Sequence, residues 1–73
     1  SDFYYVNKIA QPTGEHEVHA SSCRYLPSAE NRICLGFFAN GREAVREAKN
    51  TIAMLMDASS VVLNHIQGST GRD

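Results

Sequence analysis

Apolar and polar positions alternate at 15–20, and the segment 3–9 is rich in aromatic and β-branched residues; both patterns are typical of β-strands. The segments 3–9 and 15–20 are separated by turn-forming residues at 11–14, which predicts that they pair as a hairpin. The third apolar segment is 33–38, and it follows a polar, proline-containing loop at 21–31. We therefore expect an antiparallel sheet of three strands.

The apolar spacing changes to a helical one after Asn40. Asn40 and Glu43 have the spacing of a capping box, which predicts that a helix begins there. Apolar or small residues then recur every three or four positions on one helical face, namely Val45, Ala48, Ile52, Leu55, Met56, Ser59, Val62, Leu63 and Ile66. Because neither Gly nor Pro interrupts before Gly68, we predict one helix of about 26 residues or two collinear helices broken near Ser59 and Ser60. The alternative is a fourth strand at 61–66, because short apolar runs are ambiguous.

These elements predict an α+β fold, in which a three-stranded antiparallel β-sheet is followed by a long C-terminal α-helix. The alternative fold is βββαβ, with the fourth strand at 61–66. The chain has 73 residues, which is the size of one domain. We expect a single small α+β domain at 1–67 and a disordered tail at 68–73, because the tail is polar and rich in glycine.

The predicted helix is longer than the sheet beneath it. A helix of about 26 residues extends about 39 Å, whereas a six-residue strand covers only about 20 Å. Val62, Leu63 and Ile66 would therefore continue the apolar face beyond the sheet. We predict a homodimer whose interface includes these three residues, because a twofold partner would bury them. The alternative is a helix that bends at Ser59 and Ser60 and folds back over its own sheet.

Charge and hydropathy argue against a nucleic-acid or membrane partner. Seven Lys and Arg against eight Asp and Glu give a net charge of −1, so nucleic acid is an unlikely partner. No apolar run approaches the ~18 residues of a membrane span, and we expect a cytoplasmic protein with no membrane contact. Arg42, Arg46 and Lys49 form a basic helix flank, but Glu43 and Glu47 lie beside it. We interpret this flank as a solvated helix face.

The candidate metal ligands are His16, His19 and Cys23, in the pattern His-x-x-His-x-x-x-Cys. In a strand, His16 and His19 point to opposite faces, and an extended chain would separate His19 from Cys23 by about 13 Å. We therefore predict no metal site and no cofactor, with this triplet as the alternative set of ligands. The same separation argues against Cys23 as a nucleophile activated by His19, so we predict no catalytic residues and no enzymatic activity.

The two cysteines, Cys23 and Cys34, are too few for a disulfide scaffold or for a zinc ribbon. They flank the loop between the second and third predicted strands, where they are able to face each other. We expect them to be reduced.

Five short motifs resemble a family of small uncharacterised bacterial proteins. They are Tyr-x-Val-Asn at 4–7, Gly-x-His-Glu-Val-His at 14–19, Cys-x-x-Leu-Pro at 23–27, Leu-Gly-x-Phe at 35–38 and Glu-Ala-Val-x-x-Ala-Lys at 43–49. The resemblance covers about two thirds of the chain. It implies the fold and supplies no activity.

A second resemblance is to the methyl-phosphotriester-binding zinc domain of bacterial DNA-alkylation repair proteins, through His19, Cys23 and the order of a Phe followed by a helix. That domain needs additional cysteines, whereas this chain has Val61, Val62 and Leu63 after the helix. The resemblance implies, as the alternative function, a degenerate metal-dependent DNA-binding domain. The function we expect is that of a non-enzymatic module for self-association, protein interaction or small-ligand binding.

Overall fold

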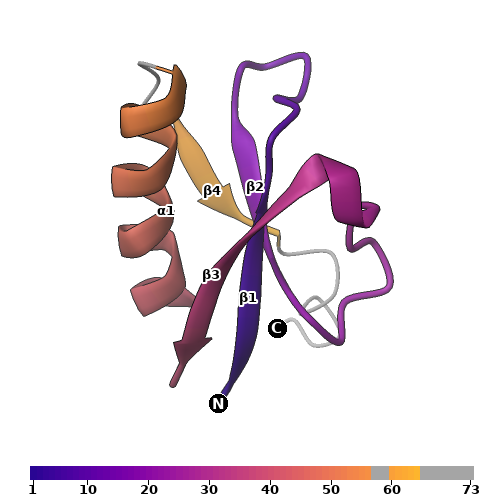
Figure 1. Cartoon of the computed structure of the whole chain (residues 1–73), viewed down its shortest axis with the longest axis vertical. Helices are drawn as coiled ribbons and strands as arrows, with labels where there is room; N and C mark the ends of the chain where they lie inside the picture. The colour runs from indigo at the N-terminus through magenta and orange to yellow at the C-terminus, as the bar shows by residue number, and fades with distance from the viewer. Residues whose placement is uncertain (57–59, 65–73) are drawn as a thin grey trace.

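The computed structural model describes residues 1–56 and 60–64. Its elements are β1 (Asp2–Asn7), β2 (His16–Ala20), the 3₁₀-helix η1 (Ala29–Asn31), β3 (Arg32–Phe38), α1 (Gly41–Met56) and β4 (Val61–Leu63). The four strands form one sheet in the order β3-β1-β2-β4. β1 pairs antiparallel with both β2 and β3, whereas β4 pairs parallel with β2. Helix α1 lies on one face of the sheet, and the loop that contains η1 lies on the opposite side (Figure 1).

The three predicted strands and the hairpin between the first two are confirmed, but the prediction of a helix of about 26 residues is wrong. Helix α1 ends at Met56, and the chain then forms β4 beside β2, as the alternative fold predicted. A strand is favoured over a continued helix at 61–63 because β-branched Val61 becomes buried against α1 while the backbone pairs with the open edge of β2. The 16 residues of α1 extend about 24 Å, which matches the sheet. Among the described residues, no helix is both long enough and apolar enough to cross a membrane.

Three of the sequence expectations fall outside the described part of the chain. The structure does not describe residues 57–59 or 65–73. The proposed break at Ser59, the interface residue Ile66 and the tail at 68–73 lie in these segments.

The start of α1 is capped nearly as the sequence predicts. The Glu43 amide donates a hydrogen bond to Asn40 Oδ1 at 3.1 Å. The Glu43 carboxylate in turn accepts from the Ala39 amide at 3.4 Å, rather than from the amide of Asn40. Both contacts satisfy amides that have no partner inside the helix, so they fix where α1 begins.

Small residues bring α1 close to the sheet. Ala44 and Ala48 lie one turn apart on the buried face of the helix, and Ile52 continues that face. All three are completely buried, together with Val6 of β1 and Val18 of β2. Because the alanines have short side chains, the large groups of the core come from the strands and from Ile52. The helix is thereby held against the two central strands.

A β-bulge at Gly36 keeps three residues of β3 directed to the core. Tyr4 pairs with Gly36 and Tyr5 pairs with Cys34, so one extra residue stands between them on β3. Gly36 has a φ of +121°, a conformation that other residues rarely adopt. The extra residue shifts the alternation, so that Ile33 and Leu35 before the bulge and Phe38 after it all pack against the core. An added Cβ on Gly36 would lie 3.5 Å from the Phe38 ring, which is an ordinary van der Waals contact.

Candidate functional site

A turn after β2 brings Cys23 back to His19. The Cys23 amide donates to the Ala20 carbonyl at 3.0 Å, which closes a tight turn over Ser21 and Ser22. Cys23 Sγ consequently lies 3.5 Å from His19 Nδ1, and both residues are buried. The predicted separation of about 13 Å between His19 and Cys23, which assumed an extended chain, is therefore wrong. The two serines were the available signal, because serine favours turns.

The side chain of Asp2 fixes this turn to the start of β1. Its carboxylate accepts hydrogen bonds from Ser21 Oγ at 2.6 Å and from Ser22 Oγ at 3.3 Å. The hydrogen bond from Ser21 is the main reason that the pKa of Asp2 is lower than usual. The hairpin and the position of Cys23 thus depend partly on an exposed carboxylate.

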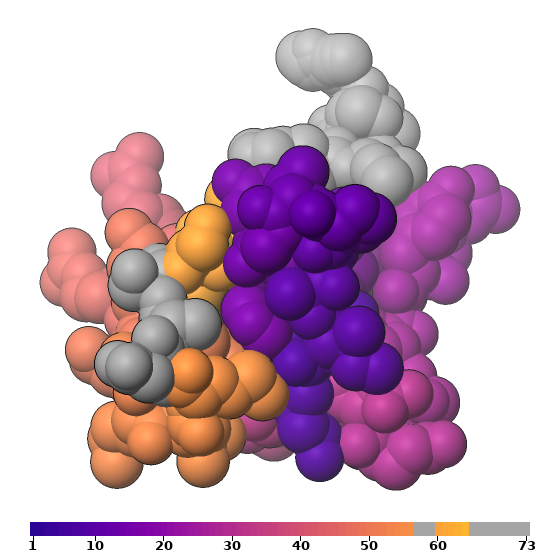
Figure 2. All heavy atoms as spheres, turned by 90° about the horizontal axis from the view of Figure 1, so that it is seen from above, coloured from indigo at the N-terminus to yellow at the C-terminus, as the bar shows by residue number. Residues whose placement is uncertain are grey.

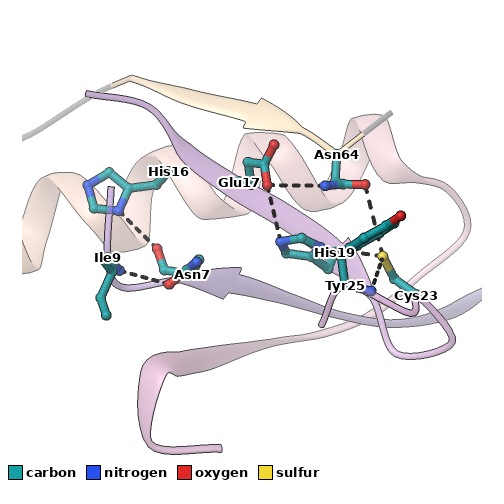
Figure 3. A network of polar contacts seen from close by, with 8 residues as sticks. All are labelled: Asn7, Ile9, His16, Glu17, His19, Cys23, Tyr25 and Asn64. Atoms are coloured by element: carbon teal, nitrogen blue, oxygen red, sulfur yellow. Dashed lines mark hydrogen bonds and ion pairs between the residues drawn. The ribbon is translucent and has the colours of Figure 1, made fainter. Parts of the chain in front are cut away.

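Two further polar residues, Glu17 and Asn64, complete a polar cluster with His19 and Cys23 (Figure 3). Glu17 Oε1 lies 3.6 Å from His19 Nε2 and accepts a hydrogen bond from Asn64 Nδ2 at 3.1 Å. Asn64 Oδ1 lies 4.0 Å from Cys23 Sγ, which also accepts from the Tyr25 amide at 3.4 Å. Asn64 could not be predicted from the sequence, because it joins the cluster only when the preceding three residues form a strand.

The polar cluster resembles a thiol activated by an imidazole, but it is closed to solutes. Cys23 is only 5% exposed and His19 only 2%. Burial lowers the pKa of His19, and the nearby Glu17 carboxylate opposes this effect without reversing it. A substrate would therefore reach the sulfur only if the loop moved. The geometry supports a structural role that ties β2, the following turn and the end of β4 together.

The three candidate metal ligands do not converge. His16 is buried, and its Nδ1 donates to the Asn7 carbonyl at 2.9 Å, away from His19 and Cys23 (Figure 3). Within residues 1–56 and 60–64, no group of three or more His, Cys, Asp or Glu side chains is placed to hold a metal ion. In the polar cluster, Cys23 meets Nδ1 of the His19 ring and the Glu17 carboxylate meets Nε2, so the thiol and the carboxylate lie against different nitrogens of the same ring.

The two cysteines are both free, as expected, but they do not form a neighbouring pair. Cys23 is buried in the polar cluster, whereas Cys34 is exposed on β3. Cys34 pairs with Tyr5 across the sheet, and Tyr5 pairs on its other side with His19. Strand β1 therefore separates the two parts of the sheet from which the cysteines come.

A groove of about 600 Å³ lies between α1 and β4, and it is the candidate binding surface. Three basic residues of α1 and three apolar residues line it, namely Arg42, Arg46, Lys49, Val45, Val62 and Leu63. We call it the basic groove. Seen from above, β4 lies beside α1, and long side chains from the first half of α1 extend into solvent (Figure 2).

The acidic neighbours on α1 do not line the basic groove. No acidic residue is among the lining residues, and the Glu43 carboxylate is turned to the Ala39 amide. In the described part of the chain, the single contact within 4.0 Å between a basic and an acidic side chain joins His19 to Glu17, so Arg42, Arg46 and Lys49 have no carboxylate partner there. Arg42, Arg46 and Lys49 are exposed, which agrees with the predicted solvated helix face. The groove beside them was not predicted, because it exists only where β4 lies next to the helix.

The residues predicted to form a dimer interface have a different setting. Val62 and Leu63 belong to β4 rather than to a helix, and both are half-buried. The Leu63 side chain packs beneath the start of α1, where both of its methyl groups lie 2.8 Å from the position of a Cβ added to Gly41. The apolar stripe that motivated the dimer is therefore absent at these two positions, and the homodimer itself stays a prediction.

A second apolar surface lies on the sheet face away from α1. Phe3 is 50% exposed and Phe37 is 60% exposed, and their rings meet edge to face at 5.0 Å. The Arg32 guanidinium lies 4.8 Å above the Tyr5 ring on the neighbouring row. This face therefore carries exposed aromatic side chains from both β1 and β3.

No protein-family model, no curated protein and no solved structure matches this chain. The two family resemblances stated from the motifs therefore stay predictions.

Proposed function

We propose that this domain is a non-enzymatic interaction module that binds an anionic segment of a partner protein in the basic groove. The observation that carries the proposal is the placement of Arg42, Arg46 and Lys49 around an apolar floor with no carboxylate partner among the described residues. Basic side chains of this kind attract an acidic ligand over a distance comparable to the Debye length, about 8 Å at physiological salt. The apolar floor adds affinity for a ligand that also carries apolar side chains.

The position of the titratable groups supports binding rather than catalysis. The charged groups that line the groove are the side chains of two arginines and a lysine. His19 and Cys23 belong to the buried polar cluster, and neither lines the groove. The groove thus offers charge and apolar surface to a ligand, without an acid–base pair.

The alternative, a DNA-binding domain, uses less of this surface. Three cations that each contact a phosphate give a salt slope of only about −2.7, which is too small for firm binding at physiological salt. A phosphate backbone also leaves the apolar floor formed by Val45, Val62 and Leu63 without a partner. We therefore expect negligible affinity for DNA of random sequence.

Fluorescence anisotropy with two labelled probes tests the proposal. The first probe is a short peptide of alternating Glu and Val, and the second is a single-stranded oligonucleotide of mixed sequence. We expect the peptide to bind and its affinity to fall as salt rises from about 50 to about 150 mM. Arg46→Glu should weaken binding roughly tenfold or more, because it reverses one of three charges in the groove.

The matched control is Arg24→Glu, since Arg24 is exposed on the loop outside the groove and its reversal changes the net charge equally. An equal loss of binding in both variants would mean that net charge, rather than the groove, attracts the peptide. Tighter binding of the oligonucleotide than of the peptide would favour the DNA-binding alternative instead. A dimer in sedimentation equilibrium that dissociates when the peptide is added would show that a second copy occupies the same surface.

A further inference from the structure

The outer edge of β4 lies alongside the basic groove. The backbone groups on this edge indicate how a partner would bind. The His16 amide donates to the Ser60 carbonyl at 2.9 Å, and the Asn64 amide donates to the Val18 carbonyl at 2.9 Å. In a parallel pair, alternate residues of one strand bond to the neighbour. The backbone N–H and C=O groups of Ser60, Val62 and Asn64 therefore point to β2. Those of Val61 and Leu63 point to the opposite edge of β4.

That edge is open in the described part of the chain, because β4 is the last strand in the order β3-β1-β2-β4. Two amides and two carbonyls of Val61 and Leu63 are thus directed outward beside the helix. An open edge of this kind is a template for one more strand.

The spacing of the basic residues matches an added strand. Along α1, Arg42 and Arg46 are separated by about 6 Å and Lys49 follows about 4.5 Å further on. Side chains on one face of a strand repeat every 6.6 Å or so, which places acidic residues at alternate positions close to Arg42 and Arg46. Helix α1 and β4 run in opposite directions side by side, since Gly41 at the start of the helix lies over Leu63 at the end of the strand.

We propose that an extended acidic segment of a partner protein binds as a fifth strand along β4, with alternate carboxylates directed to the basic groove. This inference rests on the proposed function, because it specifies how the same groove is occupied. Backbone hydrogen bonds to Val61 and Leu63 hold the segment in register, and the charges of Arg42 and Arg46 select acidic side chains. A nucleic acid uses the charges but has no strand backbone to offer to β4.

Amide hydrogen exchange followed by NMR tests this mode of binding, with the alternating Glu and Val peptide as the probe. Exchange at Val61 and Leu63 should slow roughly tenfold or more on binding, because their amides gain acceptors. Exchange at Val62 should change much less, since that amide already faces β2. Peptide binding without slower exchange at Val61 and Leu63 would overturn the added strand.

Two N-methylated forms of the same peptide separate the binding mode from the function. In one form the Glu amides carry methyl groups, and in the other the Val amides carry them. Because alternate amides of a strand face the same edge, one form should lose binding and the other should keep it. If both forms bind as well as the parent and still require Arg46, the added strand is wrong while the proposed function stands. If the parent peptide does not bind, both proposals fail.

Discussion

Replacing Leu63 with Ala distinguishes a packed fourth strand from the exposed end of a long helix. Leu63 is half-buried beneath the start of α1, so we expect a loss at the lower end of the range for Leu→Ala, about 2 kcal/mol. A domain of this size rarely has more than about 3–5 kcal/mol of stability, so the change is large. It corresponds to a fall of about 8–16 °C in Tm, measured by circular dichroism.

A double-mutant cycle with Gly41 shows whether the contact itself is responsible. A Cβ at Gly41 would lie 2.8 Å from the Leu63 methyl groups, so Gly41→Ala forces that side chain to move. The cost of Gly41→Ala should vanish in the Leu63→Ala background, with a coupling energy of about 1 kcal/mol. Met54→Ala serves as the control, because Met54 is 85% exposed on α1. A change in Tm no larger for Leu63→Ala than for Met54→Ala, together with zero coupling, would refute the packing of β4.

Two other perturbations test the bulge and the polar cluster. Gly36→Ala should destabilise the domain by about 1–3 kcal/mol, because Gly36 has a backbone conformation that other residues rarely adopt. A clash is not the expected cause, since an added Cβ makes only an ordinary contact with Phe38. Urea unfolding measures the loss of stability, and rescue by Phe38→Leu would instead indicate a clash. Burial lowers the pKa of His19, so the folded state binds fewer protons than the unfolded chain. The stabilisation is therefore present above about pH 6.5 and is lost as the pH falls below that value. Urea midpoints should decrease less between neutral and mildly acidic pH in His19→Asn than in the unmodified protein, and an unchanged decrease would contradict the assignment.

Local patterns predicted the part of the fold that depends on neighbouring residues. Alternation identified β2, the aromatic and β-branched content identified β1, and a short apolar segment identified β3. The spacing of Asn40 and Glu43 identified the start of α1. The end of the helix was missed because the residues of β4 also fit helical spacing. Their strand conformation is determined by pairing with β2, more than forty residues earlier, and periodicity carries no information on such a contact.

The candidate sites depended on the same distant contacts. Sequence spacing identified His19 and Cys23 as a possible pair but assumed an extended chain between them, whereas a tight turn brings them within 3.5 Å. It also identified the basic flank of α1. The flank becomes one wall of a groove only because β4 places Val62 and Leu63 beside it. The groove could not be predicted while these two residues were assigned to a helix.

The polar cluster and the basic groove meet at β4. A strand of three residues has few ladder bonds of its own, and two of those that hold it to β2 involve the flanking residues Ser60 and Asn64. Asn64 is buried, and its side chain also donates to Glu17 within the polar cluster. The residues that first suggested metal or thiol chemistry therefore hold in place the strand whose outer edge borders the groove. Changes to that cluster would act on binding through the position of β4, even though none of its side chains lines the groove.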